Sequence, residues 1–91
     1  MYLLITYDIS SNKRRNKIDK LLSSYGDRVN YSVFELKVKK HDMKKLIPKL
    51  KELMGKDDSI RIYRLTYETI QSALELNKNR NRPFESDISY V

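Results

Sequence analysis

The first candidate for chemistry in this sequence is Asp8, which ends an apolar N-terminal run over residues 2–7 and precedes the polar cluster Ser10-Ser11-Asn12. Ligand groups in open α/β sheets gather outside the carboxyl ends of strands. Mg²⁺ usually takes one or two carboxylates together with waters and phosphate oxygens, and it can polarise a phosphodiester. Asp8, aided by the same residue of a second chain across a two-fold axis, could therefore hold Mg²⁺. The alternative is that Asp8 only begins a turn and favours a helix N-terminus electrostatically.

Two adjacent arginines, Arg14 and Arg15, form the second candidate group. They lie four and three residues before Ile18, so they extend the inward stripe of the helix expected there. This places them near the end of the first strand and hence near Asp8, where guanidinium groups could clamp a phosphate bidentately. The alternative is that one of them forms an ion pair with Asp8 or Glu35.

Ser32 and Phe34 complete the candidate site, because a serine hydroxyl can donate to a phosphate and a phenyl ring can stack on a base. Core packing is nevertheless the commoner fate of an aromatic residue in a strand, and we expect Tyr7 and Tyr31 to lie in the core. His41 has no partner that would make it a general acid or base, so we interpret it as a solvated loop residue.

The charge of the chain favours a polyanionic partner. Lysine and arginine total 19 against 12 acidic residues, for a net charge of +7. Nucleic acid is the first candidate and an anionic membrane surface the second, while solubility is the plain alternative. A ridge of basic side chains could track a phosphate backbone, together with Lys78, Arg80 and Arg82. The ridge comprises Lys37, Lys39, Lys40, Lys44, Lys45, Lys49 and Lys51.

The 91 residues form one small domain, which buries only about 60% of the surface of its unfolded chain. The sequence has no cysteine and one histidine, so neither a disulfide nor a Cys/His metal site can stabilise it. We therefore expect a dimer. The apolar start is too short to span a bilayer and lacks the basic region of a signal peptide, which predicts a cytoplasmic protein without a membrane partner.

The first half of the chain alternates extended and helical patterns. Residues 2–7 are apolar on both faces, which predicts a strand covered on both sides. A helix follows the cap cluster at Ser10 to Asn12, and Gly26 is predicted to end it. Its apolar stripe consists of Ile18, Leu21, Leu22 and Tyr25. Residues 28–40 are extended, but their apolar phase switches between Val33 and Phe34, which indicates either two covered faces or a bulge.

The second half is less regular. Asp42 can cap a second helix that ends at Gly55, and Pro48 predicts either a kink or a start near Ile47. A strand over 60–65 follows, and residues 70–76 favour a strand by their period of two, although a helix is possible. Residues 77–83 are interpreted as a flexible basic linker. The last apolar residues, Ile88, Tyr90 and Val91, could form a strand that adds to a partner's sheet.

These elements give an α+β chain whose topology the periodicity leaves open. A ferredoxin-like βαββαβ fold needs two strands between the helices, whereas the pattern shows one extended segment. That segment is long for one strand, since a usual strand has about 5–6 residues, so it could bend near Val33 and supply both. We expect a ferredoxin-like domain over 1–76 and a linker with a terminal strand over 77–91.

Three blocks of the sequence resemble the small CRISPR-associated, endoribonuclease-like family of spacer acquisition, which partners the CRISPR integrase. The blocks are Leu3-Leu4-Ile5-Thr6-Tyr7-Asp8-Ile9, Lys13-Arg14-Arg15-Asn16-Lys17-Ile18 with Leu21-Leu22 and Tyr25-Gly26, and Arg28-Val29-Asn30-Tyr31-Ser32-Val33-Phe34-Glu35, followed later by Ile60-Arg61-Ile62-Tyr63. The match covers about the first two-thirds of the chain. Asn30 departs from the family, which often has Gln there, and the residues from Tyr67 onward carry little signature.

The resemblance implies a ferredoxin-like fold and a homodimer with facing sheets. It also implies that Asp8 is an Mg²⁺ ligand, and that Arg14 or Arg15, Ser32 and Phe34 match positions implicated in nuclease activity. Some family members are metal-dependent endonucleases on RNA or duplex DNA, and others are non-catalytic bridges that hold DNA between integrase dimers. A toxin-type ribonuclease family shares the fold and is a third possibility.

We therefore expect a nucleic-acid-binding homodimer of spacer acquisition with Mg²⁺-dependent endonuclease activity on single-stranded RNA or duplex DNA. A DNA-holding adaptor of the integrase is the alternative.

Overall fold

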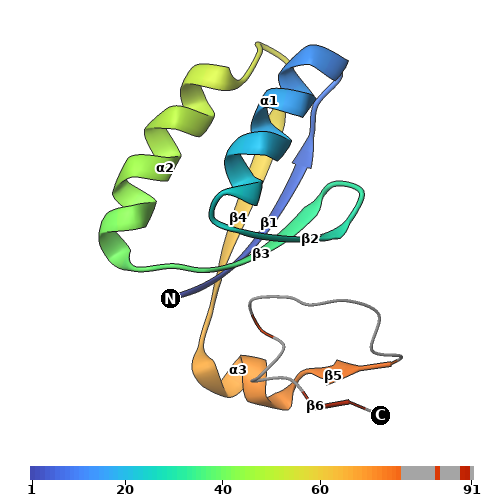
Figure 1. Ribbon diagram of the computed structural model, residues 1–91, viewed down its shortest axis with the longest axis vertical. Coiled ribbons are helices and arrows are strands. Elements are labelled where there is room, and N and C mark those ends of the chain that lie inside the picture. The colour runs from blue at the N-terminus through green and yellow to red at the C-terminus, as the bar shows by residue number, and fades with distance from the viewer. Residues whose placement is uncertain (77–83, 85–88, 91) are drawn as a thin grey trace.

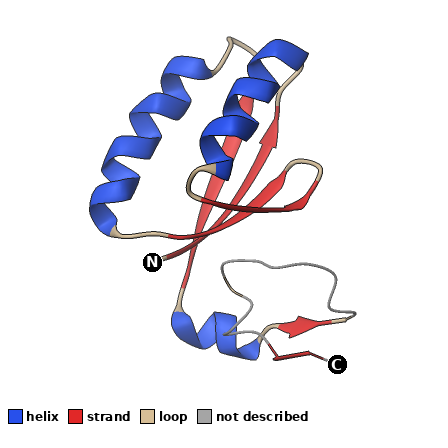
Figure 2. Cartoon of the chain, viewed as in Figure 1, coloured by secondary structure: helices blue, strands red, loops and turns tan. Residues whose placement is uncertain are grey.

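A four-stranded antiparallel sheet with two helices on one face forms the body of the molecule (Figures 1 and 2). The computed structural model describes residues 1–76, Phe84 and Ser89–Tyr90. In chain order the elements of this body are β1 (Tyr2–Asp8), α1 (Asn12–Ser23), β2 (Gly26–Asn30), β3 (Val33–Lys37), α2 (Lys40–Leu53) and β4 (Ser59–Leu65). The spatial order β2-β3-β1-β4 places the first strand in the middle. This is the ferredoxin-like βαββαβ arrangement, as expected.

The long extended segment between the helices is a hairpin, which supplies the second strand that the periodicity alone did not reveal. Its turn lies at Tyr31–Ser32, and the register of the β2–β3 pair shifts between Arg28 and Asn30. The turn and the shift together explain the switch of apolar phase at Val33, because each changes which residues face the core.

The prediction that Gly26 ends the first helix is wrong, because α1 ends at Ser23 and Gly26 is the first residue of β2. There it lies against the neighbouring strand so closely that an added Cβ would stand 2.3 Å from the carbonyl oxygen of Glu35. A glycine is therefore required by this close approach of two backbones. The start of the helix agrees with the sequence: Ser11 is the N-cap, and its hydroxyl accepts a 3.2 Å hydrogen bond from the Arg14 amide.

The second helix, α2, begins earlier than the proline suggests. It runs without interruption from Lys40 to Leu53 and includes Pro48, whose side chain is exposed. A start near Ile47 is therefore wrong. Asp42 is not the cap but lies in the first turn, where its carboxylate accepts a 3.0 Å hydrogen bond from the Lys39 amide. A carboxylate at this position also suits the positive end of the helix dipole.

The core fills the space between the sheet and the two helices. Alternation along β1 turns Leu3, Ile5 and Tyr7 toward the helices, where α1 and α2 cover them (Figure 1). The other inward residues are Ile9, Ile18, Leu22, Phe34, Leu36, Val38, Met43, Leu46 and Leu50. Burial of one such large apolar side chain contributes roughly 1.5–3 kcal/mol, so this layer fixes the position of everything built on the ends of the strands.

The opposite face of the sheet is not covered by α1 or α2 and is partly apolar. Tyr2, Leu4 and Thr6 of β1 are half-buried there. Phe84, from the C-terminal part of the chain, is buried and packs edge-on against Tyr2, with 5.2 Å between the ring centroids. The two-sided apolar pattern of the first strand therefore corresponds to one fully covered face and one partly covered face.

The C-terminal elements lie beyond the end of β4 (Figure 1). They are α3 (Tyr67–Ser72), β5 (Leu74–Glu75) and β6 (Ser89–Tyr90), and β5 pairs with β6 in parallel within the same chain. The strand predicted for 70–76 is therefore a helix for its first part. The predicted linker at 77–83, with Ile88 and Val91 of the predicted terminal strand, lies outside the described residues. No helix among the described residues has the length and apolarity that crossing a membrane requires.

Candidate functional site

A small hollow of about 150 Å³ lies at the carboxyl end of β1. It is built where β1 ends, where α1 begins and where the β2–β3 hairpin turns. These segments meet because β1 and β3 are antiparallel neighbours, with Thr6 opposite Val33, so the hairpin turn comes to the end of β1. The Tyr7 amide donates a 3.2 Å hydrogen bond to the Ser32 carbonyl and fixes the turn there. The hollow is lined by Tyr7, Asp8, Ile9, Arg15, Tyr31 and Ser32.

Asp8 supplies an open carboxylate to this hollow. Strand alternation turns Tyr7 inward to the helices and Asp8 outward, so Asp8 is exposed while its neighbour is buried. Within the described part of the chain, no hydrogen bond or ion pair engages the Asp8 carboxylate. Its lone pairs are therefore available to a cation or to a substrate proton.

Arg15 lies in the same hollow, as the helical stripe predicted. Its Nη1 donates a 3.1 Å hydrogen bond to the Ile9 carbonyl, and its Nη2 donates to the side-chain oxygen of Asn12. Its guanidinium carbon also stands 6.0 Å from the centroid of the Tyr31 ring. The side chain is thus held in place by neutral groups, and no acid among the described residues neutralises its positive charge.

Arg14 has a different environment, which we call the closed corner and define as Ser10, Arg14, Gly55 and Asp58. Its Nε donates to Asp58 at 2.7 Å and its Nη2 at 3.2 Å, a bidentate pair. The amides of Gly55 and Ser10 donate to the same carboxylate at 2.7 and 3.4 Å. The predicted pairing of an arginine with Asp8 or Glu35 is therefore wrong for Arg14, whose partner is Asp58.

Asp58 is the central acid of the closed corner, and its side chain is 0% exposed. The Arg14 guanidinium, followed by the Gly55 amide, lowers the pKa of this carboxyl to about 2. An added Cβ at position 55 would lie 2.4 Å from the Arg14 guanidinium carbon, so a larger residue there would have to displace the Arg14 side chain. The sequence marks Asp58 only as part of a turn, and no local pattern indicates its partner 44 residues away.

Phe34 does not reach the hollow. Its ring is 0% exposed and packs against the Tyr7 ring, with centroids 6.2 Å apart, so it cannot stack on a base in this position. Arg28 covers it from β2 at 5.5 Å and pairs with Asp19 of α1. Tyr7 donates its hydroxyl to the same Asp19, and burial, reinforced by that acid, raises the pKa of Tyr7 above its ordinary value. This group ties α1 to the sheet.

The prediction that Tyr31 is a core residue is wrong. It lies in the hairpin turn, is 71% exposed and stands at the lip of the hollow. Sequence alternation misled here because it treats the segment as one strand. The signal that could have found it is the polar pair that flanks it, Asn30 and Ser32, since asparagine and serine are common in turns. His41 is exposed, but it lies in the first turn of α2 rather than in a loop.

The donors around Asp8 fit only a metal that keeps most of its ligands outside the chain. Among the described residues there is no group of three or more His, Cys, Asp and Glu side chains that could hold a metal ion. Asp8 offers one carboxylate, and Ser32 beside it offers a hydroxyl. Mg²⁺ is commonly bound in this way, through one or two carboxylates with waters and phosphate oxygens. A second chain that brings its own Asp8 would complete such a set.

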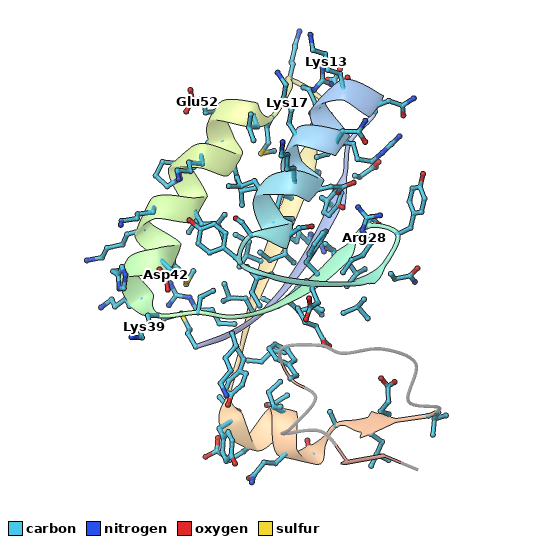
Figure 3. All side chains as sticks on the ribbon, in the orientation of Figure 1. Lys13, Lys17, Arg28, Lys39, Asp42 and Glu52 are labelled. Carbon is cyan, nitrogen blue, oxygen red and sulfur yellow. The ribbon has the colours of Figure 1, made fainter. Side chains whose placement is uncertain are left out.

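The outer surfaces of the helices are basic. Lys13 and Lys17 project from α1, and Lys39 projects at the start of α2 (Figure 3). All seven lysines of the predicted ridge are exposed, while Lys78, Arg80 and Arg82 lie outside the described residues. The ammonium group of Lys37 stands 5.4 Å from the centroid of the Tyr2 ring. Exposed lysines of this kind provide a sequence-independent attraction for phosphates.

Comparison with known proteins gives a consistent result. The family model described as CRISPR associated protein Cas2 matches residues 1–73. A Chloroflexus aurantiacus protein named CRISPR-associated endoribonuclease Cas2 1 is 48% identical over 67 residues, which cover 71% of this chain and 72% of that protein. The Mycobacterium tuberculosis CRISPR-associated endoribonuclease Cas2 is 38% identical over 65 residues and 71% of this chain, but the match spans only 58% of that relative's length.

Solved structures agree with these sequence matches. The crystal structure of Streptococcus pyogenes Cas2 at pH 6.5 superposes with a TM-score of 0.69 at 35% identity and covers 72% of this chain and 87% of that one. A chain of the partial Cas6-RT-Cas1–Cas2 complex gives a TM-score of 0.68 at 35% identity, with 79% and 86% covered. The fold, the similar relatives and the family match over residues 1–73 lead to one conclusion: this chain belongs to the Cas2 family of CRISPR-associated proteins.

Proposed function

We propose that the chain acts in CRISPR adaptation as a homodimer that binds nucleic acid and cleaves phosphodiester bonds with Mg²⁺ at the hollow around Asp8. One observation carries this proposal: the same hollow brings together an exposed carboxylate, a serine and an arginine. No acid among the described residues neutralises that arginine. The endoribonuclease names of the relatives point in the same direction.

Each polar residue of the hollow has a separate proposed role in binding or cleaving the phosphodiester. Arg15 uses N–H groups on Ile9 and Asn12, but a guanidinium carries five donors, so others remain for a phosphate oxygen. The Ser32 hydroxyl can donate to a second phosphate oxygen. Asp8 would hold Mg²⁺, which, when bound, lowers the pKa of its water and polarises the phosphate. The buried core behind β1 keeps these groups in a fixed relation.

A homodimer is proposed because one chain provides one carboxylate and one partly covered apolar sheet face. Leu4 and Thr6 are half-buried on that face, and Tyr63 of β4 beside them is exposed. A second sheet packed there would remove this surface from water and would suit a domain that is small for independent stability. The ends of the two β1 strands, each with its Asp8, would then belong to one assembly.

The test is cleavage of labelled single-stranded RNA and duplex DNA with and without Mg²⁺ by the wild type and by Asp8→Ala at equal nucleic-acid occupancy. We expect the variant to lose roughly 100- to 1,000-fold in rate, the usual cost of removing one charge-stabilising group, while it keeps its binding and its melting temperature. Asp27→Ala, which removes an exposed carboxylate from β2, is the matched control and should cleave normally. Equal cleavage by wild type and Asp8→Ala would exclude the role of Asp8.

A second candidate is an adaptor that holds DNA for the CRISPR integrase without cutting it. The exposed lysines of the basic ridge favour it, and a structural relative is part of a complex that contains Cas1. On this hypothesis neither protein in the test above cleaves, Asp8→Ala supports integration normally, and deletion of residues 68–91 abolishes co-elution with the integrase. A toxin-type ribonuclease is a third possibility, which integrase-dependent function would argue against.

A further inference from the structure

Tyr31 presents its ring to solvent next to the proposed phosphate site. It is 71% exposed, which is unusual for a large aromatic side chain that could have packed inward. Its backbone is fixed rather than loose, because its amide donates a 2.7 Å hydrogen bond to the Asn30 side-chain oxygen. The next residue, Ser32, is bonded to β1 through its carbonyl. The backbone that carries the ring is therefore held at the lip of the hollow.

A cation stands beside this ring, and its side chain is anchored. The Arg15 guanidinium stands 6.0 Å from the ring centroid, within the range of a cation–π contact. Arg15 is held in turn by its hydrogen bonds to Ile9 and Asn12. A ring with a fixed cation beside it and most of its surface in solvent is prepared to receive a flat group with little loss of entropy.

The size of the hollow indicates what that flat group is. Its volume of about 150 Å³ is small beside the roughly 300–1,000 Å³ of a typical ligand pocket. The hollow therefore fits a phosphate group but not a whole nucleotide. A nucleotide whose phosphate is bound by Arg15 in this hollow must place its base outside, and Tyr31 is the aromatic surface at that lip.

We propose that Tyr31 is a base-stacking platform that selects nucleic acid with an unstacked base beside the bound phosphate. Stacking on a protein aromatic requires a base that is splayed out of a helix, as in single strands, loops and frayed ends. The platform would therefore favour single strands over closed duplex. This inference rests on the proposed binding of phosphate at the hollow, and it specifies the substrate class.

The experiment measures binding in EDTA, so that no cleavage occurs. Fluorescence anisotropy gives the affinity for a short adenine strand, for a strand of the same length without bases and for a hairpin duplex. Tyr31→Ala should weaken binding to the adenine strand by roughly 5- to 150-fold, the usual range for one stacked base, and should leave the other two affinities unchanged. Tyr67→Ala, at a 48% exposed tyrosine in α3, is the matched control and should change none of them.

Two further variants separate stacking from apolar contact. Tyr31→Phe keeps the ring and should bind the adenine strand like the wild type, whereas Tyr31→Leu keeps apolar volume without a flat face and should weaken binding nearly as much as Tyr31→Ala. An equal weakening on all three ligands, or full binding by Tyr31→Leu, would overturn the platform. Because binding is measured without Mg²⁺, a failure of the Asp8 cleavage test would remove the nuclease and leave this result to stand or fall separately.

Discussion

The closed corner around Arg14 and the hollow around Asp8 are both built on the first turn of α1, yet they treat their carboxylates in opposite ways. In the corner, the Asp58 side chain is 0% exposed, and its carboxylate accepts hydrogen bonds from Arg14, Gly55 and Ser10. In the hollow, Asp8 is exposed, and no group in the described part of the chain engages it.

The difference teaches which charged groups hold the fold and which remain for a ligand. A buried carboxylate must be paired, because an unpaired buried charge costs several kcal/mol. Asp58 therefore stabilises the junction of α1 with the loop before β4, and its hydrogen bonds are committed. Asp8 bears no such cost in water, so its open carboxylate is tolerated and stays ready to bind.

The largest effect on stability should come from Asp58→Ala. This change removes the carboxylate that accepts hydrogen bonds from the Arg14 guanidinium and the Gly55 amide. We therefore expect the melting temperature to fall by roughly 5–15 °C. Circular dichroism during heating measures it. Asp57→Ala, at the exposed neighbouring acid, should lie within about 2 °C of the wild type. Equal melting temperatures for the two variants would contradict the claim that the Asp58 carboxylate stabilises the fold.

A smaller effect should appear as a dependence of stability on pH. The pKa of Asp58 is lowered from 3.8 to about 2 in the folded chain, so the unfolded chain takes up the proton first as the pH falls. Its contribution to stability is complete above about pH 3.8 and is lost as the pH falls toward about 2. Urea unfolding across this window should show a steeper decline for the wild type than for Asp58→Asn. Parallel curves would contradict the assignment of this contribution to Asp58.

The sequence was sufficient for features that depend on local pattern. The inward stripe of α1, its Ser11 cap and the position of Asp8 at the end of an apolar strand all follow from neighbouring residues. The hairpin at Tyr31–Ser32 needed the resemblance to a family, because a bulge and a turn mimic one long strand when only periodicity is considered.

Other features depend on contacts that no local pattern encodes. Arg14 and Arg15 both extend the same helical stripe, and their separation is decided by Asp58, which lies 44 residues from Arg14 in sequence. The positions of Phe34 and Tyr31, one proposed for the site and the other for the core, are reversed in the structure for a related reason. The hairpin turn carries Tyr31 to the surface, while pairing of Ile5 with Phe34 keeps that ring under the helices.

The smallest effect should be a change in the salt dependence of nucleic-acid binding when Arg14 or Arg15 is replaced. It compares the two arginines, and hence the closed corner and the hollow, most directly. Arg15→Ala removes a cation that no described acid neutralises. If that cation binds one phosphate of a single strand, its removal should make the slope of log affinity against log salt shallower by about 0.7. Arg14→Ala removes a cation that Asp58 already neutralises, so its slope should match the wild type while its melting temperature falls. Filter binding over a range of salt concentrations measures both slopes. If Arg14→Ala changed the slope as much as Arg15→Ala, the two arginines would share one phosphate site, and the corner could no longer be considered closed.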